Sequence, residues 1–316
     1  MNPNESVKFC AACATDVGRK RKHNEDSVLC RHDLGLFIVA DGMGGHNAGD
    51  YASALAVDSI VRFFETTEVD FGIESVTPPN PDTDPGASRL VLAIRRANEE
   101  IVHAAQGDAT RTGMGTTVVA MYLATNGMIH IAHVGDSRCY RVGADDIEQV
   151  TQDHSFLNNV IWSQPNLGDD VVAAIPKNVI TRALGTHEAV EVEVRSEMTL
   201  PGDAYLLCSD GLSGMISASS IREVVDSIGD PEKACAELIA RANHAGGRDN
   251  VSVVIVRIDD RSDTIPHSQI DDDKLANGPL RYDRSIGEWV CSACGRAHVE
   301  GTSFCVECGV AFQPKS

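Results

Sequence analysis

Two stretches of the sequence share one design, a short apolar run that ends in Asp-Gly. They are FIVADG at 37–42 and YLLCSDG at 205–211. A run of this kind predicts a buried strand, and it places a carboxylate, Asp41 or Asp210, where the strand ends. The glycine that follows lets the backbone approach a ligand closely, because it has no Cβ. The chain is therefore predicted to hold acidic groups at the ends of buried strands.

Three further acidic motifs lie beside predicted strands. Asp26 in Asn-Glu-Asp precedes one run, Asp136 in Gly-Asp-Ser follows another, and Asp249 in GGRDN precedes the last one. A lone Asp-Gly is usually part of a turn, but five acidic motifs at strand ends could gather at one sheet edge. Crowded carboxylates repel one another unless a cation neutralises them, and oxygen ligands suit Mg²⁺ or Mn²⁺. Two such ions can activate a water for attack on phosphorus.

The order of the remaining patterns predicts the fold class. Helical periodicity occurs over 48–64, 90–101, 219–228 and 231–244, between runs that are typical of strands. Strands followed by two long helices and then more strands predict an α+β fold rather than regular βαβ alternation. The Pro- and Asp-rich stretch 66–87 predicts a long exposed loop. The predicted strands are 7–10, 28–30, 36–40, 116–123, 128–134, 190–194, 204–208 and 251–258.

Eight motifs together resemble one known family. In chain order they are RKHNEDS, FIVADGMGGHNAGDYAS, GTTVV, HVGDSRCYR, TQDHS, ITRALG, LLCSDGLSGM and GGRDNVSVVIV. Their order and spacing are similar to those of the bacterial branch of the metal-dependent protein Ser/Thr phosphatases, the type 2C class. The similarity spans about 7–258. It implies a central antiparallel β-sandwich flanked by helices, with a dinuclear metal centre at one end.

The resemblance also implies how this chain would hold two Mn²⁺ or Mg²⁺ ions. Asp41 matches the carboxylate that bridges both ions, and the carbonyl of Gly42 matches a ligand of one ion. Asp210 and Asp249 match ligands of the other ion. Asp136, together with Asp210, matches a third metal site that bacterial members have.

The resemblance assigns three more residues around the metals. Asp26 and, less directly, Glu25 match the acids that hold metal-bound waters. Arg21, four positions before Glu25, matches the phosphate-binding arginine, because a guanidinium can bind a phosphate through two hydrogen bonds. The implied mechanism is direct hydrolysis, in which an activated water attacks phosphorus and the Ser or Thr alkoxide leaves without a phosphoenzyme.

Direct hydrolysis leaves no role for a cysteine nucleophile. Cys30, Cys139 and Cys208 are interpreted as small buried strand residues. One position departs from the family pattern, because some members have a histidine proposed as general acid where this chain has Met43. The general acid is therefore unassigned, and His46 is favoured as a capping or solvated residue.

The segment 156–178 lies between TQDHS and ITRALG. In the resembling family this interval forms a flap beside the metal centre, which would help select phosphopeptides. A plain surface excursion is the alternative. Of the nearby histidines, His154 is interpreted as shaping a turn and His133 as a strand residue with a satisfied hydrogen bond.

A second metal motif lies near the C-terminus. Cys291-x-x-Cys294-Gly and Cys305-x-x-Cys308-Gly are two matching knuckles separated by ten residues. Four thiolates form a closed tetrahedral Zn²⁺ site, so the motif predicts one structural zinc ion and resembles a zinc ribbon. Two disulfides would need an oxidising compartment, which the sequence does not support.

The predicted domains are a phosphatase domain at 1–258, a flexible acidic linker at 259–286 and a zinc ribbon at 287–316. The ribbon has a net negative charge, which favours a protein partner or regulation of the phosphatase over nucleic acid. A purely structural appendage is the alternative. Cys10 and Cys13 lack a second knuckle and, three apart in a strand, would face opposite sides, so they are interpreted as strand residues.

Charge and apolar patterning exclude several broad classes. The chain has 27 basic and 46 acidic residues, a net charge of −19, which disfavours nucleic acid and anionic membranes as partners. No apolar run approaches the roughly 20 residues of a membrane helix, and the N-terminus shows no secretory signal. Together with the cysteine usage, these features lead us to expect a cytoplasmic protein.

The expected function is hydrolysis of phosphoserine and phosphothreonine in proteins, with a cognate Ser/Thr kinase as an implied partner. One alternative is a catalytically silent sensor of phosphoproteins, and another is a phosphatase of a small phosphorylated metabolite. A silent sensor should have lost a metal-centre acid, whereas all are present. The acids are Asp26, Asp41, Asp136, Asp210 and Asp249.

Overall fold

The computed structural model describes residues 7–44, 48–67, 84–164, 167–168, 171–172, 175–176 and 179–259. Of the C-terminal region it describes the backbone of three short strands, at 280–283, 288–291 and 297–298. The chain divides into two compact units, Met1–Asp260 and Arg261–Ser316. All of the acidic motifs fall in the first unit.

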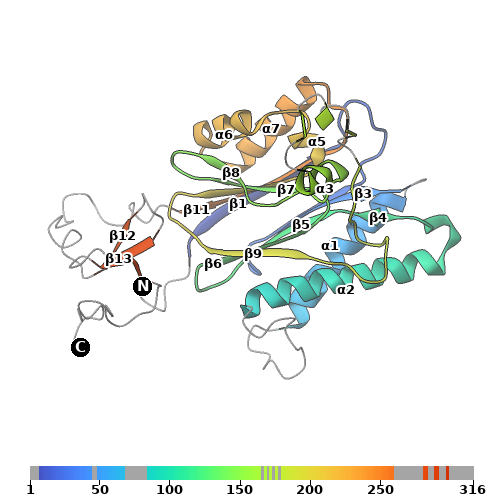
Figure 1. The fold of residues 1–316 in the computed structure, drawn as a ribbon, viewed down its shortest axis with the longest axis horizontal. Coiled ribbons are helices and arrows are strands. Elements are labelled where there is room, and N and C mark those ends of the chain that lie inside the picture. The colour runs from blue at the N-terminus through green and yellow to red at the C-terminus, as the bar shows by residue number, and fades with distance from the viewer. Residues whose placement is uncertain are drawn as a thin grey trace. The chain divides into compact units, whose positions relative to one another are not determined.

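The first unit is built on two antiparallel sheets that lie face to face (Figure 1). One sheet has the strand order β1-β11-β10-β7-β8, and the other has the order β2-β3-β5-β6-β9, with β4 paired to β3. The strands of the first sheet are β1 (Phe9–Asp16), β7 (Arg138–Val142), β8 (Ile147–Gln149), β10 (Ala204–Cys208) and β11 (Val251–Ile258). Those of the second are β2 (Asp26–Arg31), β3 (Leu36–Met43), β4 (Gly115–Thr116), β5 (Val118–Leu123), β6 (Met128–Val134) and β9 (Glu193–Met198).

Strand β3 shows why the first acidic motif follows an unbroken apolar run. Phe37 and Val39 pack between the two sheets, whereas Leu36, Ile38 and Ala40 pack in the cluster formed with the helices. All five are buried. A strand that is covered on both faces needs apolar residues at every position, so the run FIVA does not alternate.

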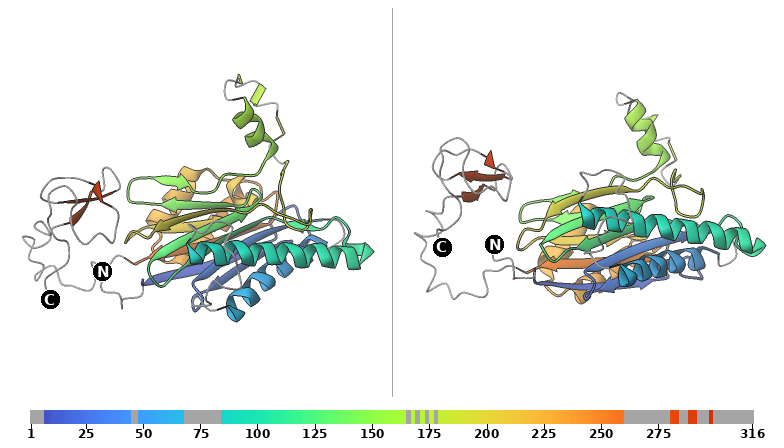
Figure 2. Two further views of the ribbon diagram at one scale, coloured as in Figure 1. Left: turned by 60° about the horizontal axis from the view of Figure 1, so that its bottom comes forward. Right: turned by 90° about the horizontal axis from the view of Figure 1, so that it is seen from below.

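Two pairs of helices cover the outer faces of the sandwich (Figure 2). α1 and α2 pack on the sheet that contains β3, and α6 and α7 pack on the sheet that contains β10. Asp84 caps α2 and Asp230 caps α7, each with a proline in the first turn. The α+β sandwich predicted from the sequence is confirmed. The helices are α1 (Ala48–Thr66), α2 (Pro85–Gly107), α6 (Ala218–Ser227) and α7 (Pro231–His244).

The largest differences from the sequence prediction in the first unit concern four strands. β1 continues to Asp16, β9 lies three residues later than predicted, and β7 and β8 are not predicted. β1, β8 and β9 are edge strands, so they carry Ala, Cys, Glu or Arg in place of a continuous apolar run. β7, with the sequence RCYRV, keeps two arginines and is held by its pairing with β10 and β8. Pairing rather than local propensity defines these strands.

The described part of the second unit is one antiparallel sheet with the order β12-β13-β14. Its strands are β12 (Leu280–Asp283), β13 (Glu288–Cys291) and β14 (Ala297–His298). Cys291 ends β13, whereas the other predicted zinc ligands, Cys294, Cys305 and Cys308, lie outside the described residues, as does most of the predicted linker 259–286. Among the described helices of the whole chain, none is long and apolar enough to cross a membrane.

Candidate active site

The structure brings the acids of the five motifs together at strand ends. Asp26 begins β2 and lies directly opposite Asp41 of β3. Asp210 begins the one-turn helix α5 (Asp210–Ser213) after β10, and Asp249 stands two residues before β11. The charges of Asp26, Asp210, Asp249 and Asp136 all act on Asp41. Carboxylates that are distant in the sequence therefore form one cluster.

Burial and mutual repulsion raise the pKa of these carboxyl groups. Burial is the largest cause for Asp41, whose pKa lies well above its usual value, and the charges of Asp26 and Asp210 raise it further. Burial also raises the pKa of Asp26 to about 6. The pKa of Asp136 is raised to about 6, first by burial and then by Asp210. A cation bound among these carboxyl groups would favour their ionised form, so that all of them could be charged together at neutral pH.

One oxygen of Asp26 indicates that the cluster accommodates a further group. Oδ2 accepts a hydrogen bond from Ser209 Oγ at 2.9 Å, whereas Oδ1 is buried and has no hydrogen-bond partner among the described residues. An unsatisfied buried oxygen costs on the order of 1–3 kcal/mol. Because the side chains of the cluster offer only oxygen, a hard divalent cation or its bound water fits this place.

Two threonines fix the backbone of Asp41. Its carbonyl accepts hydrogen bonds from Thr116 Oγ1 and from the backbone N–H of Thr117, both at 2.9 Å. Its own N–H donates to Thr117 Oγ1 at 3.2 Å. The next residue, Gly42, has no room for a side chain, because a Cβ there would lie 2.1 Å from the carbonyl oxygen of Gly49. The GTTVV motif and the start of α1 thus hold the Asp-Gly pair from two sides.

Arg21 lies at the rim of the cluster with half of its side chain exposed. Its Nη2 donates to Asp249 Oδ2 at 2.8 Å, and its Nη1 lies 4.0 Å from Glu25 Oε2. The hydrogen bond to Asp249 is the main cause that raises the pKa of Arg21. The guanidinium of Arg21 thus lies beside the acids, as its predicted role in phosphate binding requires.

Asn250 holds the segment that carries Arg21 and Glu25, a role that the sequence analysis misses. Its Nδ2 donates to the carbonyls of Val17 and His23 at 3.0 and 2.9 Å. Its Oδ1 accepts from the backbone N–H of Glu25 at 2.9 Å. The available signal was an amide residue inside an acidic motif, because an amide can donate and accept at once.

The motif TQDHS lies alongside the motif HVGDSRCYR and is bonded to it. Asp153 accepts from Arg138 Nε and Nη2 at 2.9 and 2.7 Å, a pair that the sequence analysis misses. His133 Nε2 lies 2.8 Å from the carbonyl oxygen of Gln152, which confirms that His133 is a strand residue with a satisfied hydrogen bond. The two motifs thus form one hydrogen-bonded unit around the Asp136 turn.

The cysteines of the first unit agree with the sequence analysis except at one position. Cys139 and Cys208 are fully buried, and burial raises the pKa of Cys139 well above its usual value and that of Cys208 to about 12. Cys10 is exposed while Cys13 packs against the core between the sheets, as strand alternation predicts. Cys30 is only partly buried, and its Sγ lies 3.9 Å from His32 Nδ1, so its interpretation as a buried residue is wrong.

Met43 occupies the position where some members of the resembling family have a histidine. Met43 is the last residue of β3, two residues after Asp41, and a thioether has no proton to donate. His46 lies outside the described residues. The general acid stays unassigned.

The predicted flap begins with a helix that the sequence analysis does not predict, α3 (Phe156–Ser163). Ser155 caps this helix by accepting from the backbone N–H of Asn158 at 3.2 Å. All residues of α3 are described and none is buried, and Trp162 is 77% exposed. Figure 2 shows α3 standing out from the sandwich. The described part of the segment 156–178 (hereafter the flap) thus offers its side chains to the surroundings.

Known proteins resemble this chain in sequence and in structure. The family model described as Protein phosphatase 2C matches residues 17–243. The serine/threonine phosphatase stp of Listeria innocua is 36% identical over 245 residues, which covers 77% of this chain and 93% of that protein.

Two solved structures share the fold of the first unit. The Mycobacterium tuberculosis serine/threonine phosphatase PstP/Ppp aligns with a TM-score of 0.68 and 30% identity, over 79% of this chain and 99% of that chain. The catalytic domain of PstP in complex with two manganese ions aligns with a TM-score of 0.67 and 31% identity, over 80% and 99%.

Proposed function

We propose that this chain, which belongs to the protein phosphatase 2C family, removes phosphate from phosphoserine and phosphothreonine in proteins with the help of divalent metal ions. The relatives described above are named serine/threonine phosphatases. The observation that carries the proposal is the cluster of carboxylates around Asp41, in which Asp26 keeps a buried oxygen without a partner. Crowded buried carboxylates of this kind favour the binding of divalent cations.

The acidic cluster is the proposed metal site. Two Mn²⁺ or Mg²⁺ ions, when bound, supply positive charge next to the phosphate and lower the pKa of a water molecule so that it attacks phosphorus at neutral pH. The PstP structure with two manganese ions supports this assignment. The proposed ligands are Asp41 for both ions, the Gly42 carbonyl for one ion, Asp210 and Asp249 for the other, Asp26 and Glu25 for bound waters, and Asp136 with Asp210 for a third ion.

Arg21 is the proposed phosphate-binding residue. Its guanidinium can donate two parallel hydrogen bonds to phosphate oxygens. Its present partner is the Asp249 carboxylate at 2.8 Å, and a phosphate dianion bound beside the acids would take the place of Asp249 as that partner. Asn250 holds the backbone of this segment, so the guanidinium starts from a fixed position.

We assign the C-terminal unit to recognition or regulation. The proposal rests on the spacing of its cysteines and on its division from the first unit near residue 260. The predicted partners are phosphorylated proteins in the cytoplasm, a cognate Ser/Thr kinase, and a protein that binds the ribbon. Metal analysis tests the ribbon, because one zinc per chain should be found and should be lost in Cys305→Ser; a chain without zinc would rule the ribbon out. The proposed zinc ligands are Cys291, Cys294, Cys305 and Cys308.

The test of the proposed activity is hydrolysis of a phosphothreonine peptide by metal-stripped protein to which Mn²⁺ or Mg²⁺ is added. Hydrolysis should rise with metal, vanish with chelator and be absent in Asp210→Asn. No hydrolysis at any metal concentration, with the circular dichroism spectrum intact, would leave a silent phosphoprotein-binding protein. Faster turnover of small phosphorylated metabolites than of any phosphopeptide would change the substrate class.

A further inference from the structure

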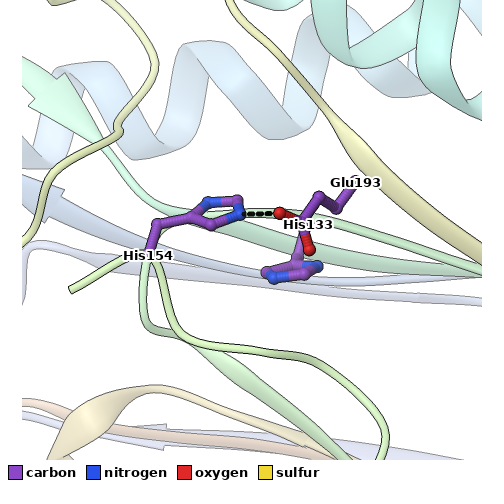
Figure 3. Close-up of side chains that lie close together, drawn as sticks. All are labelled: His133, His154 and Glu193. Carbon is purple, nitrogen blue, oxygen red and sulfur yellow. Dashed lines mark ion pairs between the residues drawn. The ribbon is translucent and has the colours of Figure 1, made fainter. Parts of the chain in front are cut away.

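A group of three side chains outside the acidic cluster comes from separate parts of the chain. Figure 3 shows His133 of β6, His154 of the TQDHS motif and Glu193 of β9 lying together. The two imidazole rings stack with centroids 4.6 Å apart and planes 15° from parallel. His154 Nε2 lies 3.0 Å from Glu193 Oε1, which also accepts from Arg182 Nη1 at 3.3 Å. Two imidazoles and a carboxylate at this distance are a combination that can bind a metal ion.

The hydrogen bonds of this group disfavour a metal ion. The backbone N–H of Gly135 donates to His154 Nδ1 at 3.0 Å, so the neutral ring carries its proton on Nε2 and donates it to Glu193. His133 Nε2 likewise faces a carbonyl, that of Gln152, and burial lowers the pKa of both imidazoles. A metal on His154 Nε2 would need a proton on Nδ1, which would then oppose the Gly135 N–H. The group is therefore a hydrogen-bonded support.

His154 is bonded to Gly135 twice. In addition to the bond at Nδ1, its backbone N–H donates to the carbonyl of Gly135 at 2.9 Å. Gly135 has φ +111°, and a Cβ at this position would lie 2.6 Å from the Cβ of Thr117. The residue that follows is Asp136. His154 thus fixes both backbone polar groups of a glycine whose conformation other residues rarely adopt, directly before a candidate metal ligand.

His154 also lies at the base of the flap. Its carbonyl accepts from the backbone N–H of Thr181 at 2.8 Å, and the next residue, Ser155, forms a β-bridge with Ile180. The two ends of the flap therefore meet at His154 and its neighbour. His154 is thus bonded to the turn that carries Asp136 and lies where the two ends of the flap meet.

We propose that His154 is a positioning residue that fixes the Asp136 turn to the base of the flap. Nδ1 and the backbone N–H hold Gly135, Glu193 orients the ring by accepting from Nε2, and the carbonyl holds Thr181. The inference rests on the proposed function, because it takes Asp136 as a ligand of the third metal ion. Loosening the hold on Gly135 lowers metal affinity at Asp136 without removing any ligand.

Two substitutions separate the hold on Gly135 from the rest of the ring. His154→Asn places an amide oxygen near the position of Nδ1, where it can accept from the Gly135 N–H. His154→Gln places its amide near the position of Nε2, where it can donate to Glu193 but leaves the Gly135 N–H without an acceptor. His133→Phe is the matched control, because it replaces the stacked ring and leaves both bonds to Gly135 in place.

Three readouts are measured on the full-length protein: Mn²⁺ binding by calorimetry, hydrogen exchange of the Gly135 amide, and peptide hydrolysis. In His154→Gln the weakest Mn²⁺ site should lose roughly tenfold or more in affinity, the Gly135 amide should exchange faster, and kcat should fall with little change in KM for the peptide. His154→Asn and His133→Phe should stay within about threefold of the unsubstituted protein in Mn²⁺ affinity.

Several results would overturn the proposal. Equal loss of Mn²⁺ affinity in His154→Asn and His154→Gln, or a lower melting temperature with unchanged Mn²⁺ affinity, would reduce His154 to a structural residue. A second zinc ion, in addition to the one predicted in the ribbon, that is lost in Glu193→Gln would identify the group as a metal site instead. Failure of the proposed function itself would give a different result: the unsubstituted protein would bind Mn²⁺ but hydrolyse no phosphopeptide.

Discussion

The acidic cluster and the flap meet at His154 but are built in opposite ways. The acids come from strand ends that are held by partners far away in the sequence, such as Asp26, which lies opposite Asp41 and is bonded to Ser209. Helix α3 of the flap is capped by its own neighbour Ser155 and has no buried residue. Charge is thus concentrated in a buried part of the protein, whereas apolar side chains of α3 are exposed on its surface.

This contrast separates two kinds of substitution. A change in the acidic cluster alters charge in a buried place, so it should affect both metal-dependent chemistry and stability. A change on the exposed face of α3 should affect the choice of substrate and leave stability unchanged. If substitutions in the acidic cluster and on α3 affected activity and stability alike, the contrast between buried charge and exposed side chains would not hold.

The largest effect is expected from Asp41→Asn. The amide removes the charge shared by both proposed metal ions, so hydrolysis of a phosphothreonine peptide should fall by roughly 10³-fold or more. The metal-free variant should melt at the same or a higher temperature, because one of the repelling carboxylates is gone. Turnover within tenfold of the unsubstituted protein would contradict the assignment of Asp41.

The second effect concerns the stability of the metal-free protein. The pKa values of Asp26 and Asp136 are raised to about 6 in the folded state, against about 3.9 when unfolded. The folded state then binds more protons between these values, so the free energy of unfolding should fall as pH rises from about 4 to about 6. Ionisation of each group should lower the free energy of unfolding by on the order of 3 kcal/mol over this range.

Melting of chelator-treated protein at pH 4, 5 and 6 checks this dependence. The midpoint should fall with pH, Asp26→Asn should flatten the slope, and Mn²⁺ should oppose the fall by binding the ionised carboxylates. A midpoint that rises steadily through this window would show that the cluster is already neutralised by groups of the protein itself.

A smaller effect is expected from Arg21→Ala at the rim of the cluster. Loss of a charged hydrogen bond to the phosphate should lower kcat/KM by roughly 10- to 100-fold. Arg21→Lys keeps the positive charge but cannot donate two parallel hydrogen bonds, so its kcat/KM should lie between those of Arg21→Ala and the unsubstituted protein. Mn²⁺ affinity should not decrease, since Asp249 loses its competing partner. If kcat/KM is unchanged in Arg21→Ala, the phosphate is bound elsewhere.

The smallest effect is expected from Trp162→Ala on the flap. This side chain is 77% exposed, so the melting temperature should not change. KM for a phosphoprotein substrate should rise by roughly threefold or more if the ring contacts it, while hydrolysis of a small aryl phosphate stays the same. Val194→Ala, an exposed apolar residue on β9, is the matched control. An equal loss on the small substrate would place Trp162 in the chemical step.

The acidic strand ends could be predicted from the sequence because each carries its signal locally. The run FIVA is apolar throughout since β3 is covered on both faces, and Asp41 follows directly. The same holds for β10, whose five residues are all buried before Asp210. Alternation was also sufficient to place Cys10 and Cys13 on opposite faces of β1.

What the sequence did not reveal depends on partners that are distant along the chain. β1 is a full strand because Phe9 to Asp16 pair with Ile258 to Val251, although its alanines and cysteines are weak strand formers. The Arg138–Asp153 pair and the three hydrogen bonds of Asn250 likewise join separate motifs. No local pattern encodes these contacts, because each residue type is equally typical of a solvated turn.

The alignment of Asp26 with Asp41 is set at the far end of their hairpin. The pairing runs without a break from Asp26–Asp41 to Arg31–Leu36, where a four-residue turn reverses the chain. A slip of one residue along this ladder would turn the Asp26 side chain to the opposite face of the sheet. Insertions and deletions in the turn at 32–35 should therefore be far rarer among homologues than substitutions there, since the length of a surface turn sets the spacing of two buried acids.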